Sequence, residues 1–82
     1  MIIVFNEKRE GILKYDAYED RYYLYQNEDY MHNFHCGDCF EIYYAEDNEW
    51  VEVRLEMDNN GWYLIGGYCR YPNELLGHRI RR

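Results

Sequence analysis

Residues 38–65, DCFEIYYAEDNEWVEVRLEMDNNGWYLI, decide the fold class of this chain. Apolar and polar side chains alternate along residues 38–45, and the alternation returns in residues 50–57. A period of two places every second side chain on the same face of a β-strand, so both segments are predicted to be strands with one buried face. The polar run 46–49 between them is typical of a turn. The stretch therefore predicts an antiparallel hairpin.

The second half of the stretch adds a further strand to this hairpin. Asn60-Gly61 stands between residues 50–57 and residues 62–65. This dipeptide is the strongest short-range hairpin signal, because both residue types accept a positive φ. Gly66-Gly67 then ends the pattern. Three successive antiparallel strands are expected across residues 38–65.

Shorter signals on both sides predict more strands. Strands are expected at 11–16, 21–26 and 77–81, a helical or 3₁₀ turn at 71–76, and a short helix or long loop at 27–37. A small sheet avoids exposed edges by curling into a barrel. The prediction for residues 1–82 is therefore a single all-β domain: a small SH3-like barrel of five or six short antiparallel strands with one short helical or 3₁₀ turn.

Composition limits the classes of function. The 82 residues carry a net charge of −7, and 20% of them are aromatic. Eight acids against one base fall in residues 38–60, whereas residues 61–82 hold four arginines against one acid. Strong general nucleic-acid binding needs many phosphate-neutralising cations and is not expected.

The cysteine count and the N-terminus bear on the compartment. Three cysteines without a secretory signal do not predict a disulfide framework. The apolar start, residues 1–5, is too short for a signal peptide or a membrane span. We expect a cytoplasmic protein. Residues 1–5 either add a strand that closes the barrel or form the contact of a homodimer.

Several short motifs together resemble a known family. They are Gly11-x-Leu13-x-Tyr15, Arg21-Tyr22, His35-Cys36-Gly37-Asp38-Cys39-Phe40-Glu41, Trp50-Val51, Arg54-x-Glu56, Trp62-Tyr63-Leu64-x-Gly66 and Leu76-Gly77-x-x-x-Arg81. In this order and spacing, over residues 11–81, they resemble the bacterial domain-of-unknown-function family 5348. The resemblance implies a short SH3-like β protein, often encoded on mobile elements, and it supplies no activity, catalytic residue or cofactor.

The spacing Cys36-x-x-Cys39 is the sharpest chemical motif. It matches one knuckle of a structural zinc site, to which His35 or His32 would add a ligand. Cys69 and His78 would have to fold nearby to complete the site. The alternative is that Gly37-Asp38 makes a turn into the next strand and that both thiols are ordinary side chains. Outside residues 32–39 the sequence has no second C-x-x-C or H-x-x-H pair, so no metal is assigned.

The leading functional hypothesis is a non-catalytic protein–protein interaction module. Tyr43, Trp50 and Tyr63 are predicted on the face that also carries Glu52, opposite the core face. Exposed aromatics on small barrels often bind an extended or proline-rich peptide, and the acids would favour a basic one. The alternative is that these rings merely cover a thin core. No catalytic motif and no cofactor site are predicted.

A nucleic-acid-related role is the alternative function. The acids of residues 38–58 could imitate the phosphates of DNA on a rigid surface. Conversely, Arg79, Arg81 and Arg82 could make a weak contact with a phosphate backbone. Neither version identifies a partner.

Overall fold

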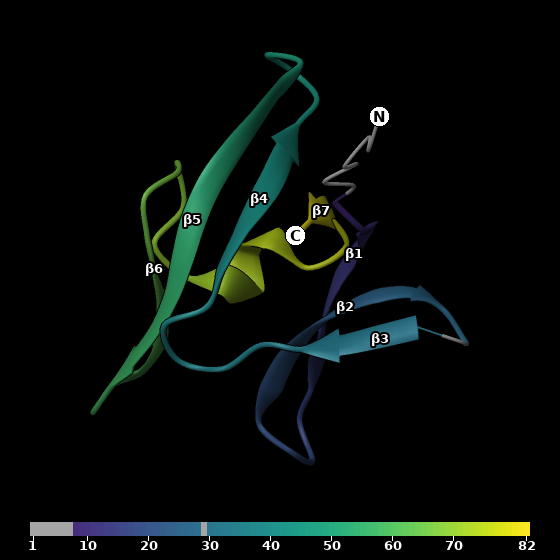
Figure 1. Ribbon diagram of the computed structural model, residues 1–82. Helices are drawn as coiled ribbons and strands as arrows, with labels where there is room; N and C mark the ends of the chain where they lie inside the picture. Colours follow the sequence, from purple (N-terminus) through teal and green to yellow (C-terminus); the bar gives the residue numbers. More distant parts are fainter. Residues whose placement is uncertain (1–7, 29) are drawn as a thin grey trace, which may run out of the picture.

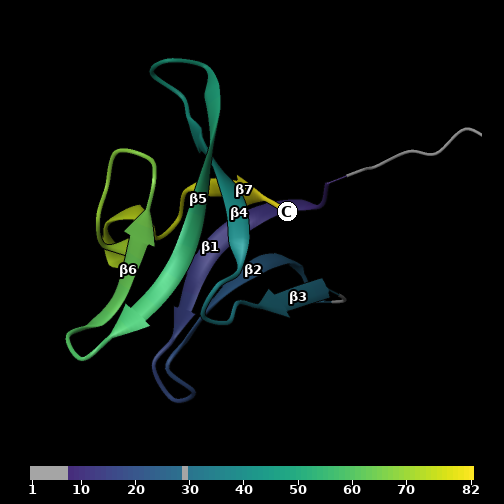
Figure 2. The ribbon, with the colours of Figure 1, turned by 60° about the vertical axis from the view of Figure 1, so that its left-hand side comes forward.

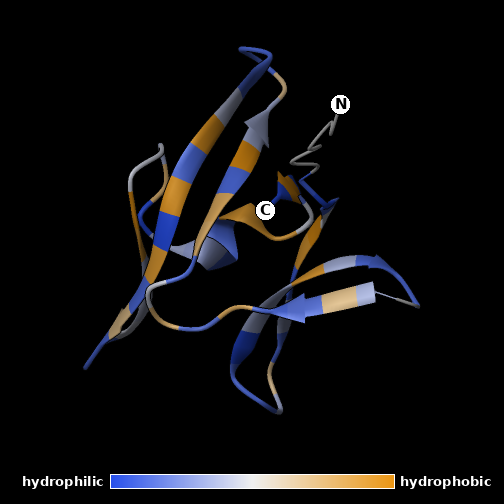
Figure 3. Cartoon of the chain, in the orientation of Figure 1, coloured by the Kyte–Doolittle hydropathy of each residue, from blue (hydrophilic) through white to orange (hydrophobic). Residues whose placement is uncertain are grey.

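The alternating stretch forms the hairpin that its pattern predicts. The computed structural model describes residues 8–28 and 30–82, and in it β4 (Cys39–Tyr44) pairs with β5 (Glu49–Asp58) in antiparallel register. The inward face of β4 and β5 is buried at its centre, at Phe40, Ile42, Val53 and Leu55. Hydrophobic and hydrophilic residues alternate along both strands, as the banding in Figure 3 shows. The two-residue turn Asn59-Asn60 joins β5 to β6 (Gly61–Ile65), and Gly61 pairs with Asp58 at a φ of +112°, which confirms the predicted meander.

A second meander precedes the first one. β1 (Glu10–Asp16), β2 (Arg21–Asn27) and β3 (Tyr30–Asn33) pair in succession. After β6 the chain makes the 3₁₀ helix η1 (Pro72–Leu75), and β7 (Arg79–Arg81) then returns between β1 and β4. The described strands form one sheet in the order β3-β2-β1-β7-β4-β5-β6. The C-terminal strand thus joins the two meanders (Figure 1).

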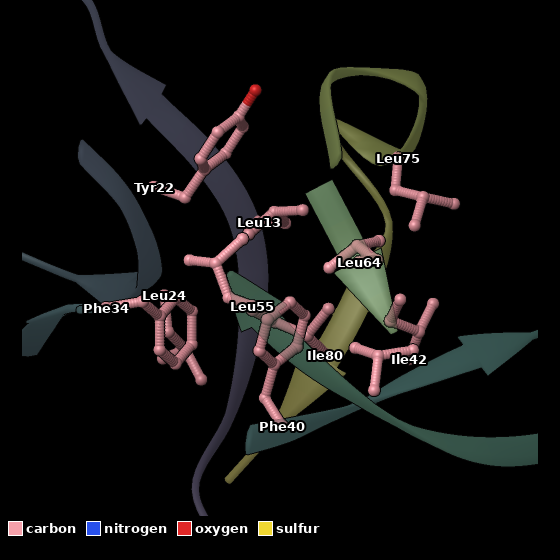
Figure 4. Close-up of a cluster of buried hydrophobic side chains, with 11 residues drawn as sticks. Leu13, Tyr22, Leu24, Phe34, Phe40, Ile42, Leu55, Leu64, Leu75 and Ile80 are labelled. Carbon is pink, nitrogen blue, oxygen red and sulfur yellow. The ribbon is translucent and has the colours of Figure 1, made fainter. Parts of the chain in front are cut away.

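The core lies between the two meanders, because the sheet bends and turns their inner faces toward each other (Figure 2). Its fully buried members include Leu13, Leu24, Phe34, Ile42 and Leu55. Figure 4 shows the rings of Phe34 and Phe40 face to face within this cluster; their centroids are 4.5 Å apart. Leu75 of η1 covers one end of the core.

Two predictions about the fold are wrong. The segment 27–37 was expected to be a helix or loop, yet it contains strand β3, which raises the count to seven strands. The sheet is also open, because no ladder joins β3 to β6 in the part of the chain that the structure describes. Antiparallel strands and a 3₁₀ turn are confirmed; the likeness to SH3 domains stays a prediction.

The open sheet has a physical cause at both edges. Strand β3 has only four residues, and the outer edge of β6 is already used, because the Leu64 N–H donates to the Arg70 carbonyl at 2.7 Å. The segment after β3 instead connects the two meanders, because it bonds to both β2 and β5. There the Phe34 N–H donates to the Tyr22 carbonyl at 2.9 Å, and Gly37 N–H donates to the Leu55 carbonyl at 2.7 Å. The prediction that residues 1–5 form a strand or a dimer contact lies outside the described residues.

Candidate functional site

The four predicted binding residues are not all neighbours. Tyr43 and Trp50 lie opposite each other on β4 and β5, with ring centroids 5.2 Å apart. Glu52 follows on the same face of β5. Tyr63 instead lies opposite Glu56, which is roughly 20 Å from Trp50 along the strand. The predicted surface therefore gathers around Tyr43, Trp50 and Glu52, and excludes Tyr63.

The arginines of β7 belong to this same face. The Arg79 guanidinium lies 5.1 Å from the ring centroid of Tyr43, and that of Arg81 lies 4.0 Å from the ring centroid of Trp50. The third predicted arginine, Arg82, follows β7, and its backbone exchanges two hydrogen bonds with the backbone of Arg9 next to the β1–β7 pairing. The aromatic residues and the C-terminal arginines are predicted as alternative sites, and the structure places Tyr43 and Trp50 of the first in contact with Arg79 and Arg81 of the second.

Ion pairs neutralise much of the charge on this face. Arg79 pairs with Glu10 at 2.8 Å, and Arg81 pairs with Glu41 at 2.7 Å. Lys8 also pairs with Glu41. The arginines hold these carboxylates while their planar groups cover the aromatic rings. A basic ligand at Trp50 would have to displace an arginine, so the surface predicted from the sequence is poorly suited to bind a basic ligand.

A hollow opens beside this face, at the end of β4. It has a volume of about 670 Å³ and is lined by residues of the β4–β5 turn, the β6–η1 loop and the start of β7. The lining residues are Tyr43, Tyr44, Ala45, Glu46, Asp47, Tyr68, Gly77, His78 and Arg79. This volume lies within the range of small-molecule and side-chain binding sites. We call it the Tyr44 hollow.

Aromatic rings form the walls of the Tyr44 hollow. The Tyr44 and Tyr68 ring centroids are 4.8 Å apart with an interplanar angle of 76°, and the Tyr44 and His78 centroids are 6.3 Å apart at 65°. Tyr68 donates its backbone N–H to the Tyr44 hydroxyl at 3.4 Å. Because these rings are steeply inclined to one another, they form adjacent walls of the hollow and do not stack in parallel.

Gly67 allows the β6–η1 loop to approach Tyr44. Its φ is +73°, in the region that L side chains rarely adopt. A Cβ atom at this position would also lie 2.9 Å from Cγ1 of Val53 and 3.4 Å from the Tyr44 hydroxyl. Only a glycine therefore fits without moving the loop that carries Tyr68.

Negative charge surrounds the rings. The Tyr68 hydroxyl donates to a Glu49 carboxylate oxygen at 3.2 Å, and the charge of Glu49 raises the pKa of Tyr68. Burial raises the pKa of Tyr44, so both phenols stay neutral at physiological pH. Glu46 and Asp47 are exposed on the turn that forms one rim.

Sequence reasoning missed most of this hollow. The alternation along residues 38–45 places Tyr44 on the same face as Phe40 and Ile42, but of these three only Phe40 and Ile42 are buried. Tyr44 is the last inward-facing residue of β4 and lies at the end of the core. Its position at the end of the alternating stretch is the one feature of the sequence that pointed to the hollow. Tyr68 and His78 reach the hollow through the β6–η1–β7 connection, and no local pattern predicts that path.

The cysteine motif forms a turn. The Asp38 N–H donates to the His35 carbonyl at 3.0 Å, and Gly37 has φ +94°, which are the features of a type II turn. The thiol of Cys36 donates to Glu56 at 3.3 Å, while Cys39 is exposed opposite Arg54. Among the residues described, no group of three or more histidine, cysteine and acidic side chains is placed to hold a metal ion.

The fold and the hollow define a small open-sheet β protein with an aromatic, acid-rimmed recess. Its sequence matches the family model "Domain of unknown function (DUF5348)" over residues 11–81, and the chain belongs to this family. It is also similar to a structural-genomics crystal structure of a protein from Ruminococcus gnavus. That chain is 36% identical, with a TM-score of 0.76, over 90% of this chain and 100% of the other. No curated protein matches the sequence. Across the described residues, no helix has the length and apolarity needed to cross a membrane.

Proposed function

We propose that this protein is a non-catalytic protein–protein interaction module that binds an extended basic segment of a partner in the Tyr44 hollow. The observation that carries the proposal is a recess of about 670 Å³ with aromatic walls and carboxylates at its rim. Flat rings pack well against an extended chain, and a negative rim selects a positive ligand. The net charge of −7 adds long-range attraction for such a partner.

Two features support binding rather than catalysis. None of the described residues that line the hollow is a serine, threonine or cysteine nucleophile. Glu46 and Asp47 lie on an exposed turn, where water solvates both carboxylates. Acid–base catalysis by paired carboxylates usually needs a less solvated environment than this turn provides.

The nucleic-acid alternative receives less support from the geometry. Arg79 and Arg81 pair with Glu10 and Glu41, so neither is free for a phosphate. The acids proposed for DNA mimicry are also interrupted, because Glu41 and Glu56 are themselves neutralised by basic side chains. A continuous row of free carboxylates is what mimicry needs.

The test uses three short labelled peptides of equal length, rich in arginine and proline, in glutamate and proline, or in alanine and proline. Fluorescence anisotropy should show binding of the basic peptide alone. The double change Glu46→Gln and Asp47→Asn should weaken it, whereas Glu19→Gln, an exposed acid on the β1–β2 turn, is the matched control. Equal binding of the acidic peptide, or equal loss in both variants, would contradict the proposal.

A pull-down from host lysate, with and without nuclease, then separates the two functions. Recovery of one protein in both halves supplies a natural partner whose binding the Glu46 and Asp47 variant must reduce. Loss of the captured material after nuclease treatment would identify nucleic acid as the bridge and favour the alternative.

A further inference from the structure

The Tyr44 hollow has walls of a kind that attract cations. Tyr44 and Tyr68 meet at 76°, and Tyr44 and His78 at 65°, so a group placed in the hollow faces more than one ring. The face of an aromatic ring carries a negative quadrupole, and cations bind best where several such faces converge. The ring of Tyr68 is 64% exposed and open to a ligand.

The chain fills comparable positions on the adjacent face with its own cations. Arg79 covers Tyr43, and Arg81 covers Trp50. Within the described chain, by contrast, no arginine or lysine lies over the ring of Tyr44 or Tyr68. The two rings that line the recess are thus left without an internal cation.

The charges around the recess favour a positive group. Glu46 and Asp47 form part of its lining, and Glu49 holds the Tyr68 hydroxyl at 3.2 Å. One cation, Arg79, also lines the hollow, and its charge is balanced by Glu10 at 2.8 Å. The net field in the hollow therefore comes from the carboxylates of the β4–β5 turn.

We propose that the Tyr44 hollow holds the cationic head group of a single arginine or lysine side chain between the rings of Tyr44, Tyr68 and His78. This inference rests on the proposed function and specifies its ligand: one side-chain cation anchors the basic segment, and the rim acids bind its neighbours. The volume of about 670 Å³ leaves space for the residues that flank this anchor.

The test uses blocked single amino acids as probes. N-acetyl-arginine methylamide and its lysine counterpart should shift the amide resonances of Tyr68, Gly77 and His78 saturably in a nitrogen–proton NMR titration. N-acetyl-norleucine methylamide, which has a neutral side chain, should not. Tyr68→Leu should weaken binding of the cationic probes about tenfold through loss of a cation–π wall. Tyr18→Leu is the matched control, because Tyr18 is 96% exposed on the β1–β2 turn.

The outcomes separate this inference from the proposed function. Equal binding of the norleucine probe, or no saturable shift with any probe, would overturn the cation site. Basic peptides that still bind the Tyr68→Leu variant with full affinity would overturn it too, while leaving the interaction module intact. If the arginine probe binds and the basic peptide does not, the cation site stands and the proposed function fails.

Discussion

At the scale of single residues, the carboxylate of Asp20 connects two parts of the sheet that are not paired with each other among the described strands. Its Oδ1 atom accepts from the Tyr15 hydroxyl at 2.6 Å and from the Trp62 indole N–H at 3.1 Å. Asp20 lies in the β1–β2 turn, whereas Trp62 lies on edge strand β6. These bonds lower the pKa of Asp20 and raise the pKa of Tyr15 to about 12.

The Asp20 contacts predict a pH dependence of stability. The pKa of Asp20 is lower in the folded chain than its ordinary value of 3.8, so its contribution is complete above pH 3.8 and is lost as pH falls through the folded value. The pKa of Tyr15 rises from 10.0 to about 12, so its contribution is complete below pH 10.0 and is lost as pH approaches 12.

Urea unfolding of the natural chain and of Asp20→Asn, followed across this pH range, measures both limbs. The variant should be less stable at neutral pH, and the difference should shrink in acid and again in alkali. Glu19→Gln, next to Asp20, should leave the pH profile unchanged. Parallel profiles for the natural chain and Asp20→Asn would show that the contacts do not persist in solution.

Trp50 carries a second residue-scale prediction. Its half-buried ring contacts Tyr43 and lies beneath Arg79 and Arg81. Trp50→Ala should keep the fold but lower the free energy of unfolding by about 2 kcal/mol, from one aromatic pair and two cation–π contacts. Trp50→Phe should recover part of this loss. Circular dichroism and urea unfolding measure both effects, and complete unfolding of the alanine variant would instead assign Trp50 to the core.

At the scale of elements, Phe34 determines how the β3–β4 connection packs. The side chain is fully buried and stacks on Phe40 of β4 with centroids 4.5 Å apart. Phe34→Ala should cost about 3–5 kcal/mol in the free energy of unfolding. For a chain of 82 residues the total stability is on the order of 4–12 kcal/mol, so the variant should lose at least about a quarter of its stability, and most of it if the natural chain lies at the low end of this range.

Thermal unfolding measured by circular dichroism checks this expectation. Phe34→Leu keeps an apolar side chain at the site and should cost less. Met31→Ala, on strand β3 but 59% exposed, should have little effect. A fully stable Phe34→Ala variant would mean that the connection does not seal the core.

The elements also show what the sequence could predict. Alternation identified β4 and β5, and Asn60-Gly61 identified their link to β6, because these features depend on neighbouring residues. Strand β3 escaped detection, since its four residues contain His32 and Asn33 and its pairing depends on β2. The Tyr44 hollow escaped for the same reason: Tyr68 and His78 come from separate segments that only the folded chain brings together.

At the scale of the whole molecule, the open sheet explains why barrel closure was the wrong prediction. Closure would require β3 and β6 to pair, but the Leu64 N–H on β6 already donates to Arg70, and the segment after β3 binds β2 and β5 instead. Local patterns predict strands and turns, whereas closure depends on which distant edges remain free. Asp20 and Trp62 supply a side-chain contact across part of that distance.

The charge distribution of the whole molecule leads to the last prediction, that the protein does not bind duplex DNA. The net charge is −7, and the basic β7 is neutralised by Glu10 and Glu41. Fluorescence anisotropy of a short labelled duplex should therefore remain unchanged at about 50 mM salt, where phosphate contacts are strong. Binding that weakens steeply by about 200 mM salt, and that disappears when Arg79, Arg81 and Arg82 are all changed to glutamine, would contradict this. Such a result would mean that the arginines break their ion pairs with Glu10 and Glu41 to bind phosphate. The rings of Tyr43 and Trp50, which the arginines cover in the free protein, would then be exposed in the complex.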